Sequence, residues 1–165
     1  MSLRPKPAND EGRDAAHWEA VEEASELLHE ERFREALVAL RNVLQRDPTN
    51  PYAFYLAGIA LYESGEIEPS RDAYRACLRV SPTHLGARVA LSHVLRILGD
   101  TKEAVREGME ALSQSPGDGD ALHAVGLAYL ARGETVAAKK YLNAFLETQP
   151  EFEVAEEVRG ILSEM

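Results

Sequence analysis

Apolar residues recur at helical spacing in paired segments from Asp14 onward. In the first pair, most of them lie three, four or seven positions apart, which places them on one face of each segment. They are Trp18, Val21, Leu27 and Leu28, followed by Phe33, Ala36, Leu37, Leu40, Val43 and Leu44. The polar break at residues 29–32 is short, so the two helices are expected to run antiparallel. The pattern therefore predicts a helix hairpin.

Three more hairpins follow with the same alternation of apolar and polar positions. The predicted helices cover residues 51–64 and 67–80, 84–98 and 101–114, and 119–132 and 135–148. Asn50 and Pro51 suit the N-cap and the first position of a helix, because an asparagine side chain accepts a backbone N–H bond there and proline needs none. A last helix near residues 151–163 has apolar residues on one side and glutamates on the other.

The chain repeats with a period of 34 residues. Prolines stand at this interval at Pro48, Pro82, Pro116 and Pro150. Glycines that can end a helix in the left-handed conformation stand at the same interval at Gly65, Gly99 and Gly133. Glu31 takes the corresponding place in the first unit, so we expect that turn to be looser. A period of this length indicates a solenoid, in which each unit buries its faces against its neighbours.

The recurring residues carry a family resemblance. The fourth unit has Leu122, Val125, Gly126, Tyr129, Ala138, Leu142 and Pro150, and the second has Phe54, Ala57, Gly58, Leu61, Ser70, Tyr74 and Pro82. This pattern resembles the tetratricopeptide repeat. The resemblance implies an all-α, right-handed α-solenoid of four helix hairpins over residues 14–150. We expect a disordered lead at 1–13 and a capping helix within 151–165.

Small residues occupy two positions of every unit, near the middle of the first helix and early in the second. They are Ala24, Gly58, Ser92 and Gly126, and Ala36, Ser70, Ala104 and Ala138. Only such residues let two helix backbones approach closely, so we expect the helices of each hairpin to cross at these positions.

Composition narrows the function classes. A net charge of −10, from 28 acidic and 18 basic residues, opposes binding to nucleic acid or to an anionic membrane surface. The single cysteine, Cys77, excludes an intrachain disulfide and is expected to be buried. No apolar run is long enough to span a membrane, and the first residues lack the features of a signal peptide, so we expect a cytoplasmic protein. No nucleophile with a base and no phosphate loop is recognisable, which predicts a protein without catalysis or cofactor.

The resemblance implies that a partner peptide or helix binds in a concave groove lined by the first helix of each hairpin. In the second unit, this helix carries Tyr52, Tyr55, Ile59 and Tyr62 at spacings that share a face. Exposed tyrosines are typical of protein interfaces. Packing between repeats is the alternative for each ring, and the sequence leaves the two open.

The third and fourth units offer a second group of candidates, Val89, His93, Arg96, His123 and Leu127. Two imidazoles and a guanidinium could receive a carboxylate of the partner, whereas ordinary solvated side chains are the alternative. A metal site is not expected, because a third ligand is missing. The lysine and asparagine clamp by which some members of the family hold chaperone tails is disfavoured, since its slots contain Val21, Ser25, Tyr55 and Ile59.

The sequence therefore predicts a non-catalytic protein interaction module. Self-assembly into a homo-oligomeric scaffold is the alternative, favoured by Trp18 near an open N-terminal edge. A secretion chaperone with this fold is a narrower third hypothesis.

Overall fold

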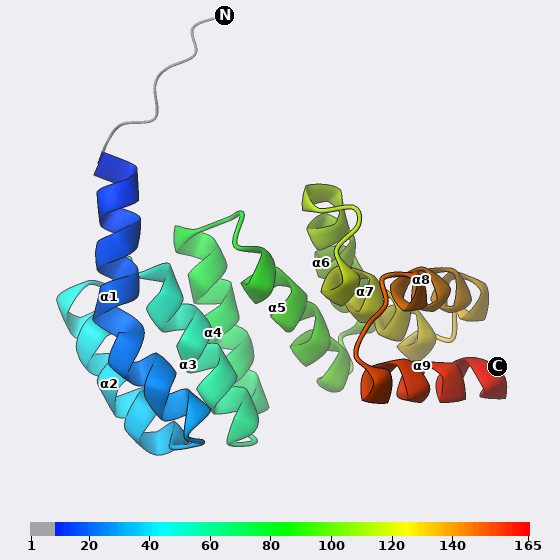
Figure 1. The fold of residues 1–165 in the computed structure, drawn as a ribbon, viewed down its shortest axis with the longest axis horizontal. Helices are drawn as coiled ribbons and strands as arrows, with labels where there is room; N and C mark the ends of the chain where they lie inside the picture. Colours follow the sequence, from blue (N-terminus) through cyan, green and yellow to red (C-terminus); the bar gives the residue numbers. More distant parts are fainter. Residues whose placement is uncertain (1–8) are drawn as a thin grey trace, which may run out of the picture. The chain divides into compact units, whose positions relative to one another are not determined.

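A computed structural model describes residues 9–165, which form nine α-helices and no strand (Figure 1). The helices are α1 (Asn9–His29), α2 (Phe33–Arg46), α3 (Pro51–Glu63), α4 (Ile67–Val80), α5 (Leu85–Ile97), α6 (Thr101–Gln114), α7 (Gly119–Ala131), α8 (Thr135–Glu147) and α9 (Phe152–Glu164). The chain divides into two compact units, Met1–Pro82 and Thr83–Met165, and each is described by itself. The predicted all-α class is confirmed.

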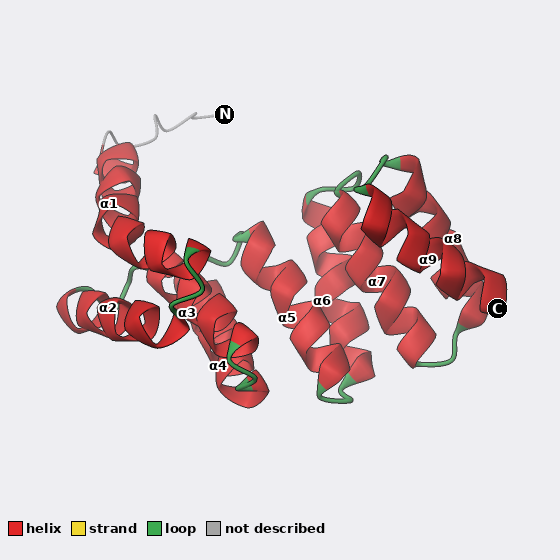
Figure 2. Ribbon diagram, turned by 60° about the horizontal axis from the view of Figure 1, so that its bottom comes forward, coloured by secondary structure: helices red, strands yellow, loops and turns green. Residues whose placement is uncertain are grey.

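The first unit consists of α1 to α4, two hairpins in which α1 packs against α2 and α3 packs against α4. Helix α3 also packs against both α1 and α2, so the second hairpin covers the first (Figure 2). The core that results is made of Val21, Ala24, Leu40, Ala53 and Leu56. The apolar faces seen in the sequence are therefore the faces that these helices bury.

The second unit consists of α5 to α9. Helices α5 and α6 form one hairpin, α7 and α8 form the next, and α7 packs against both helices of the first. Helix α9 packs against α8 and buries Val158 in a cluster with Leu122, Leu142 and Phe145. Its outward side carries the exposed Glu153, Glu156 and Glu157. Helix α9 thus covers the apolar end of the last hairpin with a charged surface.

The expected N-terminal boundary needs a correction. Helix α1 begins at Asn9, so residues 9–13 belong to the first helix and not to a disordered lead. Residues 1–8 of the expected lead lie outside the described part of the chain. The apolar pattern did not reveal this turn because Glu11, Gly12 and Arg13 are all exposed. The acidic Glu11 near the N-terminus of α1 suits the positive end of the helix dipole.

The small residues lie where the hairpin helices cross, as predicted. All eight of the positions named above are buried. Two of the crossings are also tied by a hydroxyl: Ser70 Oγ donates to the Gly58 carbonyl at 2.7 Å, and Ser92 Oγ donates to the Ala104 carbonyl at 2.7 Å. These bonds satisfy the buried hydroxyls and fix each helix pair at close range.

The four hairpin turns share one backbone geometry, which corrects the expectation of a looser first turn. Glu31 has φ 58°, beside values of 80°, 85° and 76° at Gly65, Gly99 and Gly133. The residue after Glu31, Arg32, donates its N–H to the Leu27 carbonyl at 2.9 Å, and Glu66 after Gly65 makes the same bond to Leu61 at 2.9 Å. The first turn is therefore as closed as the others, and its glutamate holds a left-handed conformation that favours glycine.

Replacing Glu31 by glycine is expected to raise the free energy of unfolding by about 0.5 to 1 kcal/mol, because glycine relieves the left-handed strain. The reverse change at an equivalent turn, Gly65→Ala, should lower the free energy of unfolding by a similar amount. Urea denaturation of the two variants measures both effects. Equal stability of Glu31→Gly and the parent chain would show that the first turn carries no strain.

Candidate functional site

Helix α3 presents part of the predicted tyrosine face to solvent. Tyr55, Ile59 and Tyr62 stand four and three residues apart and share one side of the helix. Tyr62 is 38% exposed, whereas Tyr55 and Ile59 are half-buried and pack against the core of the first unit. The Tyr55 ring also lies 6.0 Å from the ring of Tyr74 on α4. Tyr62 is thus the most accessible aromatic side chain of this face.

Tyr52 joins α3 to α1. Its hydroxyl donates to Asp14 Oδ1 at 2.6 Å, and the edge of its ring meets Trp18 at a centroid distance of 5.4 Å. The hydrogen bond to Asp14 raises the pKa of Tyr52, with burial adding to the effect. Trp18 itself remains 44% exposed. Tyr52 therefore contributes to packing within the first unit, and Trp18 offers the larger apolar surface beside it.

Val89 is a correction to the predicted site. It is only 8% exposed and belongs to a core cluster with Ala111, Ala121 and Ala124. The two alanines of α7 are small, so α7 approaches α5 closely and covers Val89. This side chain stabilises the second unit and is closed to a partner. Leu127, from the same predicted group, is half-buried against the cluster that includes α9.

His93, Arg96 and His123 come together in the second unit. The imidazoles of His93 on α5 and His123 on α7 meet edge to face at a centroid distance of 5.7 Å. The other side of His123 stacks on Phe145 of α8 at 4.6 Å. Arg96 lies one turn after His93 on α5, close enough for its charge to act on both imidazoles.

Burial keeps the two imidazoles neutral near pH 7. Desolvation lowers the pKa of His93 to about 4, and the nearby Arg96 and His123 act in the same direction. Desolvation also lowers the pKa of His123, partly opposed by Glu157 and Asp120. The guanidinium of Arg96 is consequently the one full positive charge of this cluster at neutral pH.

The buried imidazoles predict a loss of stability in acid. In the unfolded chain, His93 binds a proton near pH 6.5, whereas in the folded chain it does so only near pH 4. The unfolded state therefore holds more protons between these values, and the free energy of unfolding should fall as the pH falls through that window. The contribution of His93 reaches about 1.4 kcal/mol per pH unit at most. Urea denaturation from pH 7 to pH 4 measures it, and His93→Gln should show the weaker dependence. Identical pH profiles for the variant and the parent chain would contradict this account.

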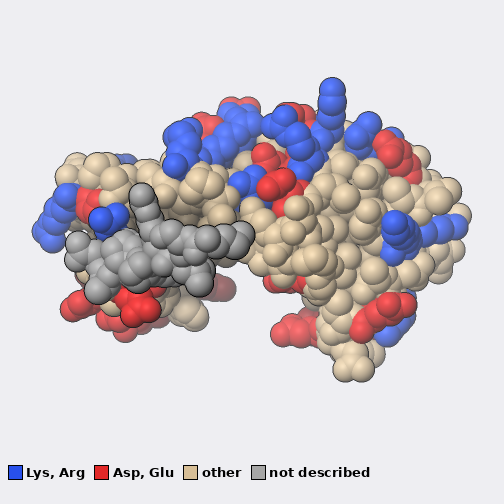
Figure 3. Space-filling view, turned by 90° about the horizontal axis from the view of Figure 1, so that it is seen from above, with Lys and Arg blue, Asp and Glu red and all other residues tan. Residues whose placement is uncertain are grey.

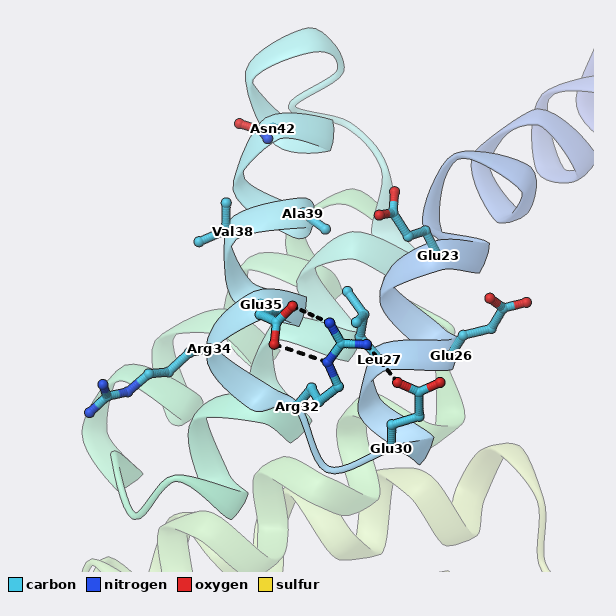
Figure 4. A pocket seen from close by; sticks show the side chains of 10 residues that line it. All are labelled: Glu23, Glu26, Leu27, Glu30, Arg32, Arg34, Glu35, Val38, Ala39 and Asn42. Atoms are coloured by element: carbon cyan, nitrogen blue, oxygen red, sulfur yellow. Dashed lines mark hydrogen bonds and ion pairs between the residues drawn. The ribbon is translucent and has the colours of Figure 1, made fainter.

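A pocket that the sequence did not reveal lies between α1 and α2 (Figure 4). It has a volume of about 600 Å³ and is lined by Glu23, Glu26, Leu27, Glu30, Arg32, Arg34, Glu35, Val38, Ala39 and Asn42. Arg32 is already paired in this pocket, because its guanidinium donates hydrogen bonds to Glu30 at 2.8 Å and to both carboxylate oxygens of Glu35. These bonds raise the pKa of Arg32 and lower that of Glu35. The pocket is open, acidic and only partly apolar.

Charge is unevenly distributed along the chain. Residues 9–32 contain nine acidic and two basic side chains, and residues 151–165 contain five acidic and one basic. These two segments account for the whole acidic excess of the chain. Figure 3 shows Lys and Arg side chains together with Asp and Glu on the face that it presents.

Among the described residues, no three His, Cys, Asp or Glu side chains are grouped so as to hold a metal ion. Residues 9–165 also contain no helix with the length and apolar content of a membrane span. Cys77 is buried as predicted, and burial raises the pKa of its thiol to about 12, which leaves it unreactive near neutral pH.

Comparison with known proteins places the helix hairpins in a family. Two tetratricopeptide-repeat models match, over residues 27–76 and 120–151. A search of curated proteins gave no match.

Three solved structures share the fold. MamA is 22% identical with a TM-score of 0.73, over 86% of this chain and 81% of its own. PilF of Pseudomonas aeruginosa is 22% identical with a TM-score of 0.80, over 93% of this chain and 70% of its own. YrrB is described as a TPR protein with an unusual peptide-binding site. It is 20% identical with a TM-score of 0.74, over 92% of this chain and 76% of its own.

The matched models fall on hairpins of both units, and the same hairpins show the buried small residues and the glycine turns expected from the 34-residue period. Sequence, packing and comparison agree, and this chain therefore belongs to the tetratricopeptide-repeat family.

Proposed function

We propose that the chain is a non-catalytic interaction module that binds a peptide or helical segment of a protein partner. Each unit contributes side chains on the first helix of a hairpin: Tyr62 and Ile59 of α3 in the first unit, and Arg96 of α5 in the second. The observation that carries the proposal is Tyr62, an aromatic side chain that is 38% exposed beside half-buried apolar neighbours on one helix face. Such partly exposed rings provide large contact area at low entropic cost.

The comparisons support this proposal through the fold. YrrB, which shares it, is described as having a peptide-binding site.

Selection of random peptides tests the proposal and does not require the identity of the partner. A displayed library of twelve-residue peptides is selected on the immobilised full chain, and the enriched peptides are titrated by calorimetry. Tyr62→Ala is expected to weaken the binding of these peptides by about 30-fold, as the loss of an interface hot spot does. Phe152→Ala is the matched control, because Phe152 is an aromatic residue that is 75% exposed on α9, which is not the first helix of a hairpin.

Two results would contradict the proposed function. One is a library from which no peptide is enriched above a control without protein. The other is a set of enriched peptides that bind the parent chain, Tyr62→Ala and Phe152→Ala equally well. A thermal melt of each variant ensures that any loss of binding is not a loss of folding.

Self-assembly is the second candidate, and Trp18 is the observation that favours it. This ring is 44% exposed on α1, and exposed apolar edges promote association. The nine acidic side chains within residues 9–32 oppose contact between two copies of this region. Light scattering over a range of concentrations distinguishes the candidates: growth of the particle mass that Trp18→Ser abolishes supports assembly, and a constant monomer mass excludes it.

A further inference from the structure

Arg96 stands apart from the other arginines of the second unit. Arg88, Arg106, Arg132 and Arg159 each form an ion pair with a glutamate. Arg96 forms none with the described residues, and its Nε is buried without a hydrogen-bond acceptor among them. A partly buried guanidinium normally has a counter-ion, because its desolvation is costly. Arg96 is therefore free to pair with an anionic group of a ligand.

The surroundings of Arg96 suit a single anion. His93 and His123 lie beside it as neutral imidazoles, each of which can donate one N–H. Ile97 follows Arg96 on α5, four residues after His93 and thus on the same side of the helix, and it is 44% exposed. An anion held at Arg96 would consequently lie next to an apolar contact.

We propose that Arg96 binds one carboxylate of the partner segment, with His93 and His123 as additional donors and Ile97 in contact with an apolar neighbour of that carboxylate. This inference rests on the proposed function and specifies the chemistry of its ligand. A guanidinium and a carboxylate form paired, charge-assisted hydrogen bonds, which give both affinity and orientation.

A peptide carboxylate fits better than a nucleic acid. Nucleic acids are bound by many cations together, whereas this cluster holds one full positive charge within a chain of net charge −10. Asp120 and Glu157 also act on His123, so they would repel a ligand with several negative charges. The ligand that matches is a largely apolar segment with one acidic group.

Charge reversal at Arg96 provides the test. Two random peptide libraries, one with free C-termini and one with only side-chain carboxylates, are selected on the parent chain, on Arg96→Glu and on Arg79→Glu. Arg79 is exposed on α4, the second helix of its hairpin, so its reversal changes the net charge equally without altering a first helix. Peptides from the parent chain and from Arg79→Glu should be enriched in an acidic group beside apolar residues. Peptides selected on Arg96→Glu should lack this acidic group and should be enriched in Lys or Arg instead.

A titration then quantifies the contact. The best peptide and its version with the acidic group neutralised (Glu→Gln, or an amidated C-terminus) are titrated into the parent chain and into Arg96→Gln. Neutralisation should weaken binding about 10-fold with the parent chain and less than about 2-fold with Arg96→Gln. Arg96→Gln also serves if Arg96→Glu fails to fold, as judged by its thermal melt. The library that supplies the best peptide tells whether the carboxylate is terminal or on a side chain.

The outcomes separate this inference from the function on which it rests. Enriched peptides without an acidic preference, or an acidic preference that Arg96→Glu retains, would overturn the carboxylate site and leave the interaction module standing. Preference for a phosphorylated form of the peptide over its glutamate form would overturn it as well. A library from which nothing is enriched would overturn both proposals.

Discussion

Replacing Gly126 by alanine is expected to lower the free energy of unfolding by about 1 to 3 kcal/mol, although alanine is the better helix former. Gly126 lies where α7 crosses α8. A Cβ added there would stand 2.6 Å from Leu142 Cδ2 and 3.2 Å from the Leu142 backbone nitrogen. Leu142 is fully buried, so neither its side chain nor its backbone can move away without disturbing the core. Urea denaturation measures the change.

Gly160 is the control in the same unit. It lies within α9, where an added Cβ would meet no atom within 4 Å. Gly160→Ala should therefore raise the free energy of unfolding by up to about 1 kcal/mol through helix propensity alone. If both alanines stabilise the chain, α7 and α8 do not approach each other closely at Gly126.

Replacing Asn50 by alanine is expected to lower the free energy of unfolding by about 2 to 3 kcal/mol. Asn50 is fully buried and has two functions. Its Oδ1 accepts the Ala53 N–H at 3.2 Å and so caps α3, and its Nδ2 donates to the His17 carbonyl of α1 at 2.9 Å. Alanine removes both bonds and leaves a gap in the packing between α1 and α3.

Substitution of Asp118 is the control that separates the capping bond of Asn50 from its bond to α1. It caps α7 in the same way, by accepting the Ala121 N–H at 2.8 Å, and no bond from its side chain to another helix is found in the described residues. Asp118→Ala should therefore cost about 1 kcal/mol, the usual effect of a lost cap. Chemical denaturation of both variants gives the difference, and equal losses would mean that the bond to His17 contributes nothing to stability.

The fold could be predicted because its signals are local and repeat. The 34-residue spacing of Gly65, Gly99 and Gly133 marks the hairpin turns, and each adopts the positive φ that the spacing implied. The helix boundaries were predicted less accurately where the sequence has no apolar periodicity. The N-terminal turn of α1 is an example, because Glu11, Gly12 and Arg13 are exposed and show no apolar periodicity.

The site was harder to predict, because it depends on which face of a helix its neighbour covers. Val89 and Tyr62 occupy similar faces in the sequence pattern, yet α7 buries Val89 through the small Ala121 and Ala124 while Tyr62 stays exposed. The pairing of charges is likewise a tertiary property. Arg88 stands where the repeat pattern has a bulky apolar residue, and its ion pair with Glu107 at 2.5 Å spans α5 and α6. The sequence alone could not show that Arg96 has no such partner among the described residues.

Mapping a bound peptide by nuclear magnetic resonance tests the central claim most directly. An enriched peptide is titrated into the isotope-labelled full chain, and amide and arginine Nε–H signals are followed. We expect the largest changes on α3 around Ile59 and Tyr62 and on α5 around His93 and Arg96, including the Nε–H of Arg96 itself. Changes confined to the second helices of the hairpins, α2, α4, α6 and α8, would contradict the claim that the first helices bind the partner.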